Sequence, residues 1–75
     1  MEDLVEFIAK SLVEEPEQVN IYSKETRRST ILKLRVAPDD TGRVIGKGGR
    51  VANAMRTLLR AANRDSDRAI ILEID

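Results

Sequence analysis

The chain has no cysteine, no histidine and no tryptophan, and phenylalanine and tyrosine occur once each in its 75 residues. Without cysteine and histidine it can form no disulfide and lacks the ligands that zinc prefers. It also lacks the commonest general base and the most reactive nucleophile, and no serine or threonine has an evident activating partner. We therefore expect a non-catalytic protein with no metal and no cofactor. So few aromatic rings also exclude a broad stacking surface for bases.

Long hydrophobic runs are absent as well. No segment approaches the roughly 20 apolar residues that span a bilayer, and the acidic start Met1-Glu2-Asp3 does not resemble a signal peptide. We expect a cytoplasmic protein without a membrane partner. Residues 1–75 form a single domain, of a size that buries only roughly 60 % of its unfolded surface. Its cohesion must come from an aliphatic core, which dimerisation could supplement.

An overall charge of one sign is also lacking, because 13 basic residues balance 13 acidic ones. The balance conceals three segments with different charge. Residues 1–20 carry a net −5, residues 21–64 carry +8, and residues 65–75 carry −3. A basic middle between acidic ends favours a polyanion as partner. The alternative is that both signs solvate the surface.

The hydrophobic pattern predicts an α+β domain with the order helix, strand, strand, short helix, helix, strand. Apolar residues at helical spacing indicate a first helix over residues 2–13, which Pro16 ends. Three strands are expected: a short one over residues 19–22, and two longer ones over 30–36 and 68–74. Residues 23–29 are expected to form a polar loop. In the second strand, Leu32, Leu34 and Val36 alternate with residues of the opposite face.

Two further segments have a predicted buried face. In the helix after position 50, one apolar stripe is expected to enter the core: Val51, Ala54, Met55, Leu58, Leu59 and Ala62. In the last strand, Ala69 and Ile71 make the second face mildly apolar too. This strand is therefore expected to be central in the sheet or covered by a partner.

Three glycines fall within four positions in Gly46-Lys47-Gly48-Gly49, hereafter the glycine loop. It follows a short helix over residues 41–45, for which Asp39 or Asp40 is the expected N-cap, and it precedes the clearest helix of the chain. A helix N-terminus offers unpaired N–H groups and a partial positive charge, which suit a phosphate. Lys47 and Arg50 add full charges. The loop is therefore a candidate site for a phosphodiester backbone.

Two common phosphate motifs do not fit the glycine loop. The P-loop pattern needs one more residue between Gly42 and Gly46, and a hydroxyl after the lysine. The dinucleotide pattern needs a third glycine where Val51 stands, and it follows a strand rather than a helix. A G-x-x-G turn between two helices does fit.

With this turn inside a β-α-α-β core, the chain resembles a KH domain. The preceding helix and strand are similar to the type II KH arrangement, α-β-β-α-α-β. The resemblance covers the whole chain and extends to the run Val36–Arg50, which is similar to that of small single-KH proteins of bacteria. It implies a three-stranded mixed sheet with three helices on one face, in which residues 30–36 and 68–74 pair in parallel.

The resemblance further implies a function as an RNA-binding protein whose loop clamps about four nucleotides of single-stranded backbone. RNA chaperone or post-transcriptional regulator is the implied role, and self-association or pairing with a second KH protein is implied as well. Val44 and Ile45 would form the groove floor, with Arg43, Arg50 and Asn53 at its rim. The opposite wall would come from the central strand, with Lys33, and from the polar loop. The implied nucleic-acid contacts are Arg43, Val44, Ile45, Gly46, Lys47, Gly48, Gly49, Arg50, Asn53, Arg27, Arg28 and Lys33.

Two alternatives stay open at this level. The chain could be a dimerising adaptor whose main role is protein contact, with RNA secondary. The row Arg56, Arg60 and Arg64, spaced by four residues, could be either a solvated helix face or a surface that follows RNA.

Overall fold

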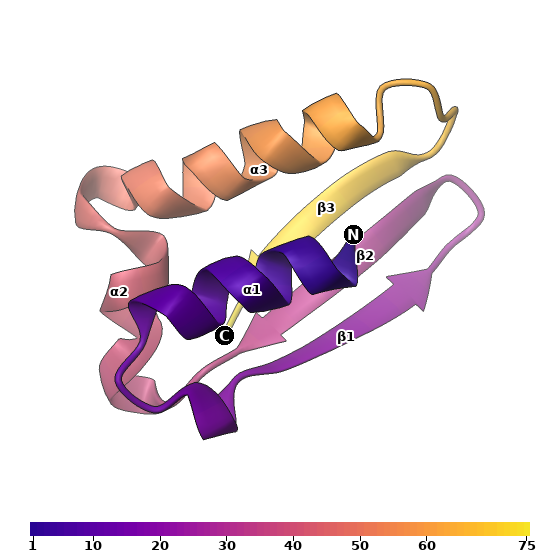
Figure 1. Cartoon of the computed structure of the whole chain (residues 1–75). Helices are drawn as coiled ribbons and strands as arrows, with labels where there is room; N and C mark the ends of the chain where they lie inside the picture. The colour runs from indigo at the N-terminus through magenta and orange to yellow at the C-terminus, as the bar shows by residue number, and fades with distance from the viewer.

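The computed structural model describes all residues from 1 to 75. It has the expected α+β order, with three α-helices on one side of a three-stranded sheet (Figure 1). None of the helices is both long enough and apolar enough to cross a membrane. The elements are α1 (Glu2–Leu12), η1 (Pro16–Gln18), β1 (Asn20–Glu25), β2 (Ser29–Arg35), η2 (Pro38–Asp40), α2 (Thr41–Ile45), η3 (Lys47–Gly49), α3 (Arg50–Ala62) and β3 (Ala69–Ile74), where η denotes a 3₁₀ helix.

The sheet has the strand order β1-β2-β3, with β1 and β2 antiparallel and β2 and β3 parallel. Two parallel neighbours need a crossover, and α2 and α3 provide it. The parallel pairing implied by the resemblance is therefore confirmed. β3 is an edge strand, so the first of the two alternatives expected for it, a central position, is wrong, and cover by a partner stays a prediction.

The hydrophobic core lies between the sheet and the helices. Alternation along β2 buries Leu32 and Leu34, and Val36 just after the strand continues the pattern as predicted. The remaining elements each contribute side chains to the same cluster: Val5 and Ala9 from α1, Val44 from α2, Met55 and Leu59 from α3, Leu72 from β3, and Val19.

The apolar stripe of α3 is only partly in this core. The buried side chains are Ala52, Met55 and Leu59, whereas Leu58 is 49 % exposed and Ala54 and Ala62 are exposed too. The prediction is confirmed for Met55 and Leu59 and for the partly buried Val51, which packs against the core. It is wrong for the other three residues, because the apolar residues cover more than one side of the helix. The sheet covers only the side that contains Ala52, Met55 and Leu59.

β1 is longer than its sequence suggested. Ser23, Lys24 and Glu25 pair with Leu32, Ile31 and Thr30 of β2, so the connecting turn contains only residues 26–28. The backbone ladder with β2 extends this edge strand over residues whose polar side chains hide the strand pattern. The turn is closed by the N–H of Thr26, which donates to the carbonyl of Ser29 at 2.8 Å.

Candidate nucleic-acid interface

The glycine loop joins α2 to α3 through three residues of positive φ. Gly46, Gly48 and Gly49 have φ values of 78°, 65° and 80°, and no other residue has a positive φ. Gly46 ends α2, as expected, and its N–H donates to the carbonyl of Gly42 at 2.8 Å. The N–H of Gly49 then donates to the carbonyl of Gly46 at 3.1 Å. The loop is therefore a hydrogen-bonded turn with a defined shape.

Gly46 and Gly48 serve different purposes in this turn. Gly46 has φ 78° and ψ 170°, a region that only glycine readily adopts. A Cβ there would lie 2.5 Å from Val51 Cγ2, so the backbone must pack directly against the start of α3. A Cβ on Gly48 would meet no atom within 4 Å. The backbone at Gly48 is thus open to an approaching ligand.

The N-terminus of α3 has an uncompensated positive charge. No side chain caps it, and its first turn contains no acidic residue. Lys47 and Arg50 are exposed beside it, and neither forms an ion pair. Because cations at a helix N-terminus oppose the helix dipole, an anion bound here would relieve an unfavourable arrangement.

Asn53 lies on the first turns of α3 beside the loop. A Cβ on Gly49 would be 3.8 Å from its Nδ2 atom. Arg56 donates from Nη1 to Asn53 Oδ1 at 3.2 Å and from Nη2 to the carbonyl of Leu72 at 3.2 Å. Arg56 therefore orients the Asn53 amide and ties α3 to β3. This role of Arg56 was not predicted, although its position three residues after Asn53 was an available signal.

Arg43 is engaged by carboxylates instead of standing free at the rim. Its guanidinium donates from Nη2 to Glu14 Oε1, and its Nε lies 3.1 Å from Asp40 Oδ1. Both partners already neutralise the cation. The structure therefore makes Arg43 a link between α2 and the segment that follows α1.

Asp40 is the buried partner of that link, with 2 % of its surface exposed. Its two carboxylate oxygens accept the backbone N–H groups of Glu14 and Glu15, each at 3.1 Å. Asp40 is the N-cap residue of α2, one of the two expected positions, but it makes no side-chain cap bond, and Asp39 is exposed and makes none either. The carboxylate of Asp40 instead satisfies two amides that lie 25 and 26 residues earlier in the chain.

The expected groove floor is divided between core and surface. Val44 is completely buried in the hydrophobic core, so its side chain cannot touch a ligand. Ile45 is half-buried and is the apolar side chain that immediately precedes the glycine loop. Of the two residues assigned to the groove floor, only Ile45 is therefore accessible to a ligand, and Val44 belongs to the hydrophobic core.

The expected opposite wall does not lie next to the glycine loop. Lys33 projects from β2 on the face opposite Leu32 and Leu34, where it pairs with Glu73 at 3.9 Å. Arg27 and Arg28 form the β1–β2 turn, which lies at the far end of the sheet from the α2–α3 connection (Figure 1). The fold therefore does not bring Lys33, Arg27 and Arg28 together with the glycine loop. Lys33 lies on the helix-free face of the sheet, and the hairpin turn lies at the end of the sheet away from α2 (Figure 1).

The side chain of the residue just before β3 holds that distant turn in place. Arg68 Nη2 donates to the carbonyls of Thr26 at 2.6 Å and Ser29 at 2.8 Å. The carbonyl of Arg68 accepts from Asn63 Nδ2 at 2.6 Å, which connects the same residue to the end of α3. The part of the expected polar loop that remains outside the strands, residues 26–28, is therefore a short turn that Arg68 holds.

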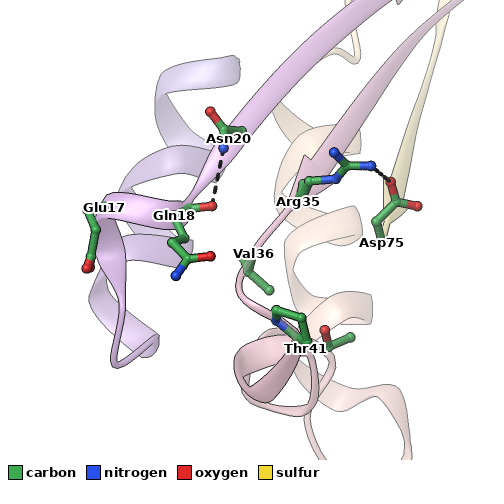
Figure 2. Close-up of a pocket in the computed structure, with 8 residues that line it drawn as sticks. Glu17, Gln18, Asn20, Arg35, Val36, Thr41 and Asp75 are labelled. Atoms are coloured by element: carbon green, nitrogen blue, oxygen red, sulfur yellow. Dashed lines mark hydrogen bonds and ion pairs between the residues drawn. The ribbon is translucent and has the colours of Figure 1, made fainter.

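The largest hollow of the molecule, about 500 Å³, lies away from the glycine loop and is shown in Figure 2. Its lining is almost entirely polar, and part of it is already paired: Arg35 faces Asp75 at 3.7 Å, and Asn20 donates to the carbonyl of Gln18 at 3.3 Å. An apolar cavity with a few convergent polar groups, which is usual for small-molecule sites, is not present there.

Comparison with known proteins agrees with this architecture. The family model "KhpA/KhpB, KH domain" matches residues 2–74. The chain is 47 % identical over 74 residues to RNA-binding protein KhpA of Clostridium perfringens, with 99 % of each chain covered. It is 50 % identical to the Listeria monocytogenes protein of that name and 40 % identical to the Aquifex aeolicus one, covering 99 % of this chain and 97 % and 94 % of theirs. No solved structure matches.

The family model covers nearly the whole chain, and the relatives have about the same length. These two findings establish membership of the family independently of the fold. The matched span includes the glycine loop and both helices that frame it. The chain belongs to the KhpA/KhpB KH-domain family.

Proposed function

We propose that this chain is a non-catalytic RNA-binding protein that holds the backbone of single-stranded RNA at the glycine loop. The observation that carries the proposal is the uncompensated positive N-terminus of α3, flanked by unpaired Lys47 and Arg50. The open backbone at Gly48 lets a phosphate approach that charge closely. Membership of the KhpA/KhpB family, whose relatives are named RNA-binding proteins, supports the same assignment.

Binding of this kind depends on phosphate contacts at the glycine loop more than on stacking. The two aromatic side chains, Phe7 and Tyr22, lie on α1 and β1, not on α2 or α3. The affinity for a short strand is therefore expected to be micromolar or weaker, with a log–log salt slope of about −0.7 per phosphate contact. These properties suit a cytoplasmic RNA chaperone or post-transcriptional regulator that releases its targets readily.

We also propose that the helix-free face of the sheet pairs with a second copy or with another KH protein. Ile31 and Ile71 are neighbours in register on this face, and Ile71 is 43 % exposed although it is a large aliphatic residue. Burial of these two isoleucines against a partner would remove apolar surface from water. Sedimentation of the chain and of its Ile71→Lys variant tests this: the wild-type protein should sediment as a dimer and the variant as a monomer.

The RNA-binding assignment is tested by the double variant Lys47→Asp and Gly48→Asp. Both positions are exposed, and aspartate tolerates the left-handed conformation of Gly48 better than most residues. Retention of single-stranded RNA should be lost while the circular dichroism spectrum stays native. The matched control is Lys10→Asp with Ser11→Asp on the exposed side of α1, which makes the same change in net charge.

Retention of RNA by the glycine-loop variant would refute the site. A wild-type chain that retains no RNA but sediments as a dimer would instead favour the role of a dimerising adaptor. Loss of retention in both double variants would show a dependence on net charge alone, and the glycine loop would lose its assignment.

A further inference from the structure

The stretch from Thr41 to Arg64 contains six basic residues and no acidic residue. In the folded chain, five of the 13 basic side chains pair with carboxylates, and only Arg43 of these five belongs to this stretch; the five are Lys10, Lys33, Arg35, Arg43 and Arg68. None of the four arginines from Arg50 to Arg64 pairs with a carboxylate. A helix that merely solvates a surface usually mixes both signs.

The arginines after the first turn of α3 follow one another at intervals of four residues. Arg56 and Arg60 lie on the helix, at a spacing at which like charges repel each other, and Arg64 lies in the turn that follows it. Arg56 is turned toward Leu72 and Asn53, whereas Arg60 and Arg64 are exposed. Arg60 makes a single bond, to Thr57 Oγ1 at 3.3 Å, and Arg64 makes none. The helix dipole favours cations and disfavours carboxylates at this end, but it does not explain why the first half of α3 has no acidic residue either.

Arg60 and Arg64 also belong to a row of polar side chains that begins beside the glycine loop. Asn53, beside Gly49, is followed at helical spacing by Thr57, Arg60 and Arg64. Thr57 Oγ1 donates to the carbonyl of Asn53 at 3.0 Å and accepts from Arg60. The row is therefore continuous from the loop to the end of α3, and the two charges that could contact phosphates lie at its far half.

The row ends at Arg64 and occupies one side of α3. Asp65 and Asp67 are exposed in the turn that follows Arg64, and they would repel further phosphates. Ala54, Leu58 and Ala61, on another side of α3, carry no charge. A strand of phosphates is thus favoured along one side of the helix and only as far as Arg64.

We infer that Arg60 and Arg64 extend the RNA path of the glycine loop along α3, so that the binding site accepts about ten nucleotides instead of four. The inference rests on the proposed function of the loop. The loop itself accounts for about four nucleotides. α3 is about 20 Å long, which corresponds to about six more at about 3.4 Å per stacked nucleotide.

The test measures the affinity of single-stranded RNAs of 4, 6, 8, 10, 12 and 14 nucleotides for the full chain. Affinity should rise with length up to about ten nucleotides and then level off. The double variant Arg60→Gln and Arg64→Gln should bind the tetranucleotide as the wild-type chain does. Loss of two phosphate contacts should make its salt slope for ten nucleotides shallower by about 1.4. If the two proteins bind equally at 1 M salt, the variant should therefore bind ten nucleotides about 25-fold more weakly than the wild-type chain at 0.1 M salt.

The matched control is Lys10→Gln with Arg35→Gln, which removes two charges from positions outside α3. This control should keep the length dependence of the wild-type chain. An equal loss in the control, or an unchanged length dependence in the α3 variant, would overturn the inference and leave the loop site intact. Failure of every RNA, including the tetranucleotide, to bind the wild-type chain would overturn the proposed function, and the extension with it.

Discussion

Gly46 and Val51 are in contact across the turn between α2 and α3, with the hypothetical Cβ of Gly46 only 2.5 Å from Val51 Cγ2 and 2.9 Å from the Val51 nitrogen. This contact fixes where α3 begins relative to α2. The direction of the first amides of α3 follows from it, and so does the place where a phosphate can be held.

The contact predicts unequal effects of alanine at three glycines. Gly46→Ala should lower the free energy of unfolding by at least about 2 kcal/mol, because it combines a forbidden backbone region with a steric clash. Gly48→Ala should cost about 1–2 kcal/mol from its positive φ alone. Gly42→Ala, inside α2 with open space around it, should be neutral or stabilise by up to about 1 kcal/mol. Urea denaturation of the three variants tests this order, and equal costs at Gly46 and Gly48 would contradict it.

Asp40 should matter to stability far more than its neighbour. Asp40→Ala leaves two amides and the guanidinium of Arg43 without their partner, and should lower the free energy of unfolding by about 2–4 kcal/mol. Asp39→Ala changes an exposed residue and should stay within about 0.5 kcal/mol of wild type. Thermal unfolding of both variants decides between a buried tether and a helix cap, since a cap role at Asp39 would make that variant the more damaging one.

Arg43 and Lys47 should differ in their effect on RNA binding. Lys47→Gln removes a free cation beside α3 and should make the salt slope of RNA binding shallower by about 0.7. Arg43→Gln removes a cation that Asp40 and Glu14 already neutralise, so the slope should not change. Titration of a short single-stranded RNA at several salt concentrations measures both. A shallower slope for Arg43→Gln would show that its guanidinium leaves the carboxylates to contact phosphate.

Arg68→Lys should loosen the β1–β2 turn. Lysine retains the charge but cannot donate to the carbonyls of Thr26 and Ser29 in the fork geometry of arginine. We expect a loss of about 1–3 kcal/mol in stability and faster hydrogen exchange of the amides in residues 26–29. Arg27→Lys, which alters an exposed side chain of the same turn, provides the control and should leave the exchange rates unchanged.

Much of the fold could be predicted from local pattern. Leu32, Leu34 and Val36 marked the buried face of β2 by their alternation, and Pro16 and Gly46 marked two helix ends. The glycine loop was identifiable because its glycines, its cations and the helix after it are adjacent in sequence. Such features depend on backbone geometry over a few residues, so the amino-acid order is sufficient to reveal them.

The partners of charged side chains were not predictable in this way. Arg43 was expected at the rim of a groove, but it is paired with Glu14, 29 residues away. Leu58 was expected in the core, but it is half exposed, because the sheet covers another side of α3. These outcomes depend on how the elements pack, and local spacing contains no information about that packing.

The sequence by itself determined the order of helices and strands, the type of turn between α2 and α3, and the basic stretch that contains it, because each arises from neighbouring residues. Only the tertiary structure decided that the β1–β2 turn lies far from the glycine loop, that Asp40 ties α2 to the chain after α1, and which cations remain free. A charge acts through the groups around it, and those groups come together from distant positions only when the chain folds.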